Sequence, residues 1–351
     1  MAPGRVVVQV VRELAPLLEL AGLETRVLPL EDRHALLRAA REIRRLRPRR
    51  AVLLTPSLSA AILARLGGVP ERRGTATDAR GWLLTESVDR GPLLGGHRVL
   101  EYLRLVDPGW DAPEPPAPKL GLTGAAREAW EAAAAAAGLA PEAPRASPGP
   151  APMRSGPEPE PPTAGAARIG AIRLGLLPGS AAPSRRWPAE RFAALARRRL
   201  DAGEEVVVFG GKGEADLTRR IVEEAPGAAD VGGRTDLPAL AGGLASCAAV
   251  VANDTGPMHL AAALGRPVVG IFGAGDPAQT RPLAARSEVV RRADLPCVPC
   301  LENRCPRRGR GFELPRARIE CLRLVTVDDV EEALMRVRGE RPADGAGGGG
   351  Q

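Results

Sequence analysis

The chain has 351 residues, of which 44% are hydrophobic and 26% are charged, and its formal net charge is +7. This apolar content excludes a globally disordered chain, and the length favours two domains over one. No apolar run reaches the roughly 20 residues that a membrane-spanning helix needs, and no signal peptide precedes the first charges. We therefore expect a soluble, cytoplasmic protein.

The excess positive charge is confined to the first third of the chain. Residues 1–105 carry 18 arginines against 11 acidic residues, and the remainder is neutral. Such a surface suits a nucleic acid or an anionic membrane glycolipid, although a solvated helix face at residues 34–47 is an equally good explanation. Aromatic residues make up only 3% of the chain and no nucleic-acid-binding motif is present, so we expect no nucleic-acid partner.

Short apolar runs alternate with helical patterns along residues 1–106. Strands are expected at residues 6–11, 26–30 and 51–55, and helices at residues 33–46 and 58–66. Strands separated by helices of this size indicate parallel βαβ units. The sequence therefore predicts an N-terminal Rossmann-like domain.

The composition changes at residue 107. Proline, alanine and glutamate dominate residues 107–169, which we expect to be a linker containing one Ala-rich helix at 124–138 and a flexible low-complexity segment at 140–167. A second βα series follows in residues 170–340, before a Gly-rich tail at 341–351 that we expect to be disordered. Its expected strands are 172–177, 205–209, 249–252 and 267–272, and its expected helices are 189–200, 214–224, 237–246, 258–264 and 327–337.

The sequence VVANDTGPMHLAAA, which starts at Val250, is the strongest local signal. It indicates a buried strand, a tight polar turn and a helix that begins near Pro257. The free N–H groups of Thr255 and Gly256 would lie at the positive end of the helix dipole, which favours a phosphate or diphosphate. Asp254 could meet a ligand hydroxyl, and His259 lies one turn into the helix. The alternative is an ordinary capped helix with a core-facing histidine.

Two further strand–loop–helix segments could contribute to a ligand site. In LPGSAAPSRRWP, small residues allow close backbone approach, and Arg185 and Arg186 could neutralise a phosphate; the alternative is a plain loop with solvent-facing arginines. In VVVFGGKGE, Glu214 could hold a ribose or cap its own helix. The P-loop spacing is absent and no GxGxxG follows a strand, so kinase and dehydrogenase functions lose their main support.

Four of the five cysteines form a cluster in the sequence. Cys297, Cys300, Cys305 and Cys321 follow the spacing CxxC-x4-C-x15-C, which could hold a structural zinc ion. Stable disulfides are not expected in the cytoplasm. Cys247 falls in a predicted core helix and is expected to be inert.

Together these segments resemble glycosyltransferase family 9, the ADP-heptose:lipopolysaccharide heptosyltransferases. The resemblance is strongest at residues 178–196, 207–214, 236–247 and 252–273, and it is weaker in the first third, at residues 16–30 and 97–103. The tail of the chain resembles the enzymes that add the second heptose more than those that add the first.

The resemblance implies a GT-B fold, in which two doubly wound domains face a cleft. The C-terminal domain would bind the nucleotide sugar and the N-terminal domain the anionic acceptor glycolipid. The implied reaction is an inverting, metal-independent transfer of heptose from ADP-L-glycero-β-D-manno-heptose to the lipopolysaccharide inner core. It would need no cofactor and would be carried out by a monomer peripheral to the inner face of the cytoplasmic membrane.

The resemblance also implies roles for individual residues of the donor site. Arg185 stands where the family usually has lysine, as the cation beside the leaving diphosphate, and it is expected to be catalytic together with Asp254. Ser180 and Ala181 match the phosphate-side loop, and Glu214 matches the ribose-binding acid. Thr235 lies at an adenosine-contacting position. Together with Asp254, the sugar and diphosphate clamp is matched by Thr255, Gly256 and His259.

The N-terminus departs from the family pattern. Members normally begin with a βα unit whose Gly-Asp loop supplies the general base, whereas MAPGRVVVQVVRELAP resembles the family's second strand. Either the true start lies upstream, or the N-terminal domain is missing its first βα unit and its base. The sequence alone does not assign that role to Asp32, Asp78 or Asp89. The alternative function is therefore a catalytically inactive nucleotide-sugar-binding homologue.

Overall fold

The computed structural model describes residues 6–23, 26–30, 36–88, 96–139, 172–305 and 320–340, with the backbone alone for residues 26–30. The low-complexity segment expected at residues 140–167 and the tail at 341–351 lie outside the described residues. None of the described helices is long and apolar enough to cross a bilayer.

The C-terminal unit is built on a parallel sheet with the strand order β11-β10-β9-β6-β7-β8. Every residue of β6, β9 and β10 is buried, as expected for apolar strands covered by helices on both faces. The strands are β6 (Arg173–Leu177), β7 (Glu205–Val208), β8 (Ala229–Asp230), β9 (Ala249–Asn253), β10 (Val268–Ile271) and β11 (Ser287–Val290).

The strand order reverses between β6 and β9. The chain adds β7 and β8 on one side of β6, crosses back, and then adds β9, β10 and β11 on the other side. Strands β6 and β9 are hydrogen-bonded neighbours, with Leu174 opposite Ala249 and Leu177 opposite Ala252. The loops that follow these two strands therefore diverge and leave a crevice at the carboxyl edge of the sheet, where doubly wound folds bind ligands.

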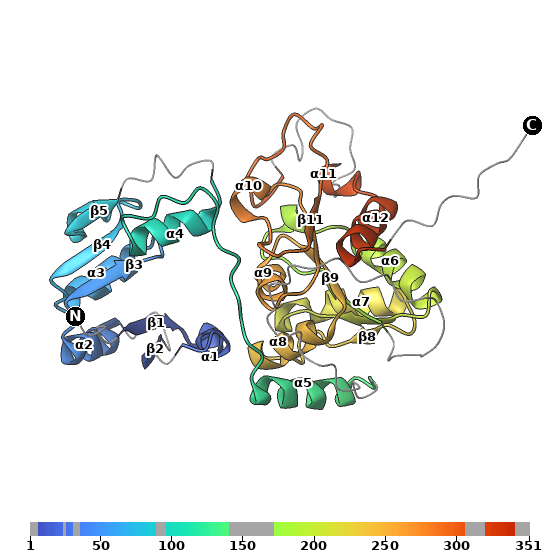
Figure 1. Ribbon diagram of the computed structural model, residues 1–351, viewed down its shortest axis with the longest axis horizontal. Helices are drawn as coiled ribbons and strands as arrows, with labels where there is room; N and C mark the ends of the chain where they lie inside the picture. Colours follow the sequence, from blue (N-terminus) through green and yellow to red (C-terminus); the bar gives the residue numbers. More distant parts are fainter. Residues whose placement is uncertain are drawn as a thin grey trace, which may run out of the picture.

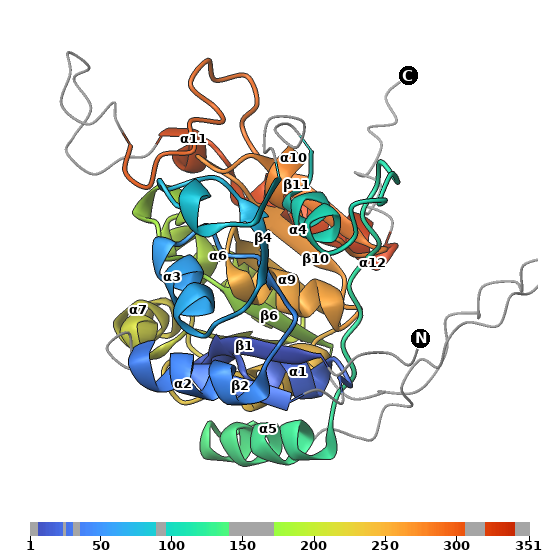
Figure 2. The same cartoon turned by 90° about the vertical axis from the view of Figure 1, so that its left-hand side faces the viewer.

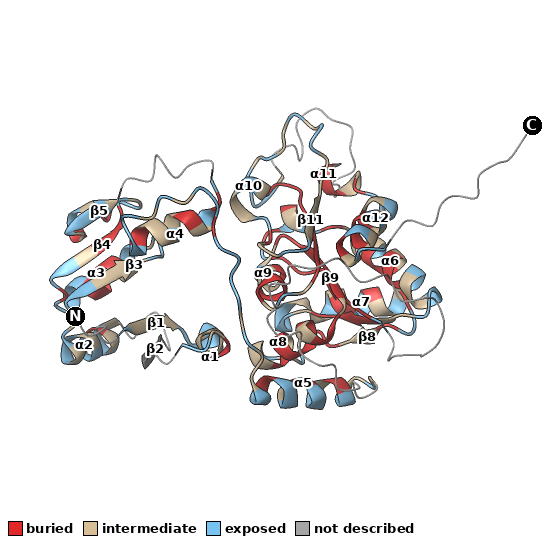
Figure 3. Ribbon diagram, viewed as in Figure 1, coloured by how far each residue is buried: buried red, intermediate tan, exposed pale blue. Residues whose placement is uncertain are grey.

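Two helical layers cover this sheet, and the core lies between them and the strands (Figures 1 and 3). An edge-on pair of Trp187 and Phe192, with ring centroids 4.9 Å apart, packs under one layer, and Trp130 packs on Phe209 under the other. The first layer contains α6 (Ala189–Asp201), α7 (Ala215–Glu224), α11 (Glu320–Arg323) and α12 (Val327–Arg338). The second contains α8 (Leu237–Ser246) and α9 (Gly256–Ala263).

Helix α5 (Gly124–Ala136), which the composition places in the linker, packs closely on α8. A Cβ at Gly242 would collide with the backbone of Ala126, and one at Gly243 would collide with the rings of Trp130 and Phe209. The two adjacent glycines therefore allow α5 to approach, and the helix forms an outer layer of the C-terminal unit (Figure 1).

The described N-terminal residues form two smaller parallel sheets, β1-β2 and β3-β4-β5. Their strands are β1 (Val7–Val11), β2 (Arg26–Leu30), β3 (Arg50–Leu53), β4 (Glu71–Thr75) and β5 (Glu86–Val88), and their helices are α1 (Pro16–Leu20), α2 (Leu36–Leu46), α3 (Leu58–Leu66) and α4 (Arg98–Val106). Strand β4, with the sequence ERRGT, has no apolar run and was not expected. Its buried Arg73 pairs with Glu86, the residue opposite it on β5.

The N-terminal elements stand beside the C-terminal unit and connect to it through the segment between α4 and α5 (Figures 1 and 2). Helix α1 also contacts the C-terminal unit, because Leu20 is buried in the same apolar cluster as Trp130 and its carbonyl accepts a 2.8 Å hydrogen bond from the Gly121 N–H. Both halves of the molecule are thus α/β units with parallel sheets.

Candidate functional site

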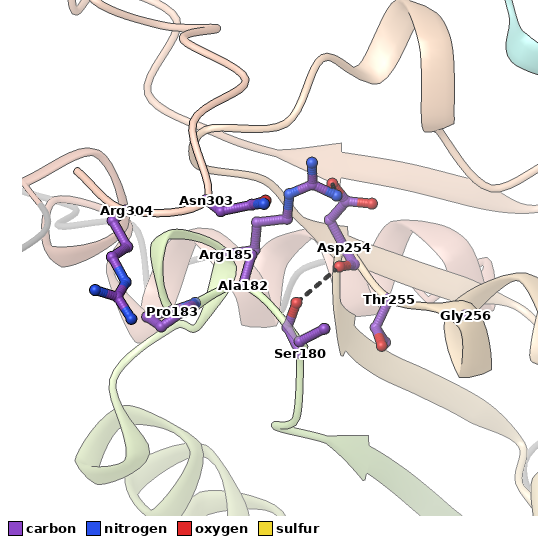
Figure 4. A pocket seen from close by; sticks show the side chains of 10 residues that line it. Ser180, Ala182, Pro183, Arg185, Asp254, Thr255, Gly256, Asn303 and Arg304 are labelled. Carbon is purple, nitrogen blue, oxygen red and sulfur yellow. Dashed lines mark hydrogen bonds and ion pairs between the residues drawn. The ribbon is translucent and has the colours of Figure 1, made fainter. Parts of the chain in front are cut away.

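A pocket of about 540 Å³ opens at the carboxyl edge of the C-terminal sheet, where the loops after β6 and β9 diverge (Figure 4). This is the crevice that the reversed strand order produces. Its lining residues come from the loop after β6, from the turn between β9 and α9 and from the segment before Cys305. They are Ser180, Ala181, Ala182, Pro183, Arg185, Asp254, Thr255, Gly256, Asn303 and Arg304.

Buried hydrogen bonds fix the two loops to each other. The Ser180 hydroxyl donates to the Asp254 carbonyl at 3.2 Å. The fully buried Asn253 side chain donates to the Pro178 carbonyl at 2.7 Å and accepts from the Trp187 N–H at 3.0 Å. One amide therefore satisfies a donor and an acceptor from the β6 loop, so the floor of the pocket is preorganised.

Arg185 and Asp254 form an ion pair in the pocket, with Nη1 and Oδ2 3.2 Å apart (Figure 4). The carboxylate is only 4% exposed, and burial raises the pKa of Asp254, although Arg185, Thr280 and Arg98 oppose that shift. Within the described residues, neither Asp254 Oδ2 nor Arg185 Nε makes a hydrogen bond. Both groups therefore retain hydrogen-bonding capacity for a ligand.

The N-terminus of α9 also opens into this pocket. Thr255 is the N-cap residue, but its side chain makes no capping hydrogen bond to the first turn. Thr255 and Gly256 both line the pocket. The free N–H groups of a helix start attract anions, so this turn is suited to a phosphate, as the sequence predicts.

Two glycines provide space for the acidic side chains near the pocket. A Cβ at Gly179 would collide with the carboxylate of Glu214, and a Cβ at Gly275 would collide with that of Asp254. The small residues after β6 were expected to allow ligand approach, whereas Gly275 was not expected to contribute. The sequence signal for Gly275 is its position in the Gly-rich loop after β10.

Six of the nine residues expected in the donor site line this pocket, namely Ser180, Ala181, Arg185, Asp254, Thr255 and Gly256. Three do not. Glu214 accepts a 2.9 Å hydrogen bond from the Gly211 N–H, which is the capping role considered as its alternative. Thr235 lies between β8 and α8, and His259 lies on α9, where burial and the nearby His97 lower its pKa.

Asn303 and Arg304 line the pocket although the sequence analysis gave them no role. Ser184 holds their loop, because its hydroxyl donates to the Glu302 carbonyl at 2.5 Å and its N–H donates to the Asn303 carbonyl at 3.4 Å. The two residues lie between Cys300 and Cys305, in a segment whose cysteines alone suggested a function in the sequence.

Burial, and then the charges of the other three clustered thiols, raise the pKa of Cys321 to about 11. Even so, across residues 297–305 and 320–340 and the rest of the described chain, no three His, Cys, Asp or Glu side chains are placed to hold a metal ion. The geometry therefore does not support the zinc site that the spacing suggested.

Comparison with known proteins gives a consistent result. The sequence profile of glycosyltransferase family 9 (heptosyltransferase) matches residues 36–309. Lipopolysaccharide heptosyltransferase 2 of Escherichia coli (strain K12) is 36% identical to the chain over 124 residues, which make up 34% of this chain. The chain spans only 36% of the length of that curated relative.

Two solved structures share the fold. The E. coli ADP-heptose lipopolysaccharide heptosyltransferase II matches with a TM-score of 0.72 and 23% identity, over 96% of this chain and 90% of that one. A family 9 glycosyl transferase from Veillonella parvula DSM 2008 matches with a TM-score of 0.71 and 20% identity, over 96% and 89%. The expected GT-B arrangement of two Rossmann-like units is confirmed. With a family profile that covers more than half of its residues, the chain belongs to glycosyltransferase family 9, the heptosyltransferases.

Proposed function

We propose that the protein transfers heptose from ADP-L-glycero-β-D-manno-heptose to the lipopolysaccharide inner core, as an inverting and metal-independent glycosyltransferase. The observation that carries this proposal is the pocket where Arg185, Asp254 and the open start of α9 converge. The name of the E. coli relative describes a heptosyltransferase that acts on lipopolysaccharide, which supports the choice of sugar and acceptor.

The cationic side of the pocket suits the departure of ADP. When the bond between heptose and phosphate breaks, negative charge develops on the diphosphate. The Arg185 guanidinium and the N–H groups at the start of α9 are fixed in place before the reaction, so they can stabilise that charge without reorganising. A fixed cation and a helix terminus can therefore carry out the role that a metal ion has in other transferases.

The acidic side of the pocket suits the sugar. Asp254 Oδ2 is buried, pairs with Arg185 and lacks a hydrogen bond within the described residues, so it has a lone pair for a sugar hydroxyl. The nucleoside would extend along the carboxyl edge of the sheet, past the loops after β7 and β8. Glu214 and Thr235 lie in those loops, which supports their proposed contacts with ribose and adenosine, and His259 would complete the clamp from α9.

The N-terminal unit would receive the acceptor. The net charge of +7 resides in residues 1–105, and a positive surface favours a phosphorylated, acidic glycolipid. We propose that the protein acts as a monomer, peripheral to the inner face of the cytoplasmic membrane, and without a nucleic-acid partner.

The test is transfer by the purified chain. Synthetic ADP-heptose and a heptose-deficient lipopolysaccharide acceptor are incubated with residues 1–351, with and without a chelator, and the product is identified by mass spectrometry and its anomeric configuration by NMR. Inverted product in the presence of chelator is expected. Binding of ADP-heptose without transfer would instead favour the inactive nucleotide-sugar-binding homologue.

Replacing the pocket cation tests the site itself. We expect Arg185→Gln to lower kcat by about 10²–10³-fold, the usual loss when one group that stabilises developing negative charge is removed. Arg220→Gln is the matched control, because Arg220 is an exposed arginine on α7 that pairs only with surface glutamates in the described structure. Transfer by Arg185→Gln at the rate of this control would exclude the proposed role.

A further inference from the structure

His97 connects the N-terminal unit to the C-terminal unit next to the pocket. It is the N-cap residue of α4 and only 8% exposed. Its Nδ1 accepts the Val99 N–H at 3.3 Å, and its Nε2 lies 3.0 Å from the carbonyl oxygen of Arg281. Since Nδ1 is an acceptor, the hydrogen-bond network assigns the ring proton to Nε2, which donates to Arg281.

The acceptor of this bond follows a segment that passes the pocket acid, since a Cβ at Gly275 would collide with the Asp254 carboxylate. Arg281 directly follows the short helix α10 (Pro277–Thr280), and Thr280 is one of the groups that lower the pKa of Asp254. An ion pair between Arg281 and Glu114, 3.1 Å long, joins the same two regions. Both of its side chains are largely exposed, so it contributes little. The buried bond of His97 is therefore the stronger link.

The residue that follows His97 adds charge to the site. Arg98 is exposed, and its charge is one of the influences that lower the pKa of Asp254. His97 fixes the first turn of α4, which carries Arg98, to the Arg281 carbonyl.

We propose that His97 is a positioning residue for the transfer reaction: its imidazole holds the start of α4 against the end of α10, in the segment that passes the Asp254 carboxylate at Gly275. The inference rests on the proposed function for its consequence in catalysis. The link itself is a structural claim that does not depend on that function.

Acid should weaken this link. Burial is the main influence and lowers the pKa of His97, while the bond to the Arg281 carbonyl raises it. Of the charged groups, Arg281 lowers this pKa and Glu114 raises it, and His259 on α9 is a further ionisable neighbour. A protonated ring still donates from Nε2, but it cannot accept the Val99 N–H, and it would place a cation at the positive end of α4. The cap on α4 is therefore present at neutral pH and lost as the pH falls through the pKa of His97, which weakens the hold on α4.

The sharpest variant is His97→Asn. Asparagine is among the best N-cap residues, so α4 keeps its cap, but its side chain is too short to reach the Arg281 carbonyl. We expect kcat/KM for the acceptor to fall about tenfold at neutral pH, the effect of one buried hydrogen bond, while the Kd for ADP stays unchanged. The ratio of wild-type to variant kcat/KM should fall as the pH drops through the pKa of His97, which burial holds below the ordinary value of histidine. Glu114→Gln, which removes only the exposed pair, should change kcat/KM less than twofold.

A second measurement does not need activity. Hydrogen exchange followed by mass spectrometry should show faster exchange in residues 277–286 of His97→Asn, with protection of the first turn of α4 retained. Unchanged exchange in residues 277–286, or a kcat/KM ratio that is the same at every pH, would overturn the inference. A wild-type chain that transfers no heptose but shows the expected exchange difference would contradict the proposed function and support the link.

Discussion

The two halves of the molecule are held together in different ways. In the C-terminal unit every residue of β6, β9 and β10 is buried, whereas no residue of β1 or β3 is. The N-terminal unit buries fewer apolar side chains and relies more on two buried arginines, Arg73 and Arg80. Arg80 is fully buried, and its guanidinium donates to the carbonyls of Thr55, Ser57 and Thr75 and to the Thr75 hydroxyl.

This difference in packing predicts which of the two units is rigid and which can move. Apolar burial stabilises the C-terminal sheet without depending on any single bond, so the donor pocket has a rigid floor. Directional bonds from Arg80 tie the segments after β3 and β4 together, over an apolar core that includes Leu63, Leu83 and Leu105 and is smaller than that of the C-terminal unit. We infer that the C-terminal unit is the stable platform and that the N-terminal unit is the part that opens locally at lower cost.

Removing a large apolar side chain from the platform should have the largest effect. Trp130→Ala leaves a cavity between α5, α8 and Phe209, and we expect it to lower the free energy of unfolding by about 4 kcal/mol in urea titrations. Trp82→Ala is the matched control, because Trp82 is 75% exposed and its loss should be nearly neutral. Equal effects of the two substitutions would contradict the apolar-platform interpretation.

Removing the buried arginine should be costly to the N-terminal unit. Arg80→Met keeps much of the side-chain volume but leaves buried carbonyls without donors, and we expect a loss of about 2 kcal/mol. Faster hydrogen exchange in residues 50–88, with little change in residues 172–305, would show where the loss occurs. Arg50→Gln removes only an exposed pair with Glu71 and should leave exchange unaltered. Faster exchange confined to residues 172–305 would contradict the role of Arg80 in the N-terminal unit.

A smaller effect is expected from a methyl group placed beside the pocket acid. In Gly275→Ala the new Cβ would collide with the Asp254 carboxylate and turn it away from the ligand. We expect about a tenfold loss of kcat/KM for the donor, since a displacement of about 1 Å in a site is costly, with an unchanged free energy of unfolding. Gly124→Ala at the start of α5 meets nothing within 4 Å and serves as the control. A donor kcat/KM equal to that of the control would show that the platform tolerates movement of Asp254.

The difference between apolar burial and buried arginines also explains which strands can be predicted from the sequence. Four strands of the C-terminal unit, β6, β7, β9 and β10, were located to within one or two residues because uninterrupted apolar runs require burial, whereas the short strands β8 and β11 were missed. Strand β4 was missed, because its arginines become buried only through partners such as Glu86, which lies on another strand. Helix α4 was indicated only by the family resemblance at residues 97–103.

The site follows the same pattern. Residues in one strand–turn–helix motif, such as Asp254 and Thr255, could be predicted because local geometry alone exposes them to a ligand. Asn303 and Gly275 could not, because their roles depend on which distant loops approach them. The cysteine spacing suggested a metal site, but spacing does not determine whether thiols converge.

The bond between Ser180 and Asp254 also has a consequence for the order in which the chain is made. The two residues are 74 positions apart, and the β8–β9 crossover lies between them. On the ribosome, the loop after β6 that carries Ser180 emerges well before Asp254, because β7 and β8 are synthesised between them. Strand β9 then pairs with β6 on the side opposite β7 and β8. A nascent chain that ends before β9 would lack both Asp254 and the start of α9. Nucleotide binding should therefore appear late in synthesis, only once β9 has inserted beside β6.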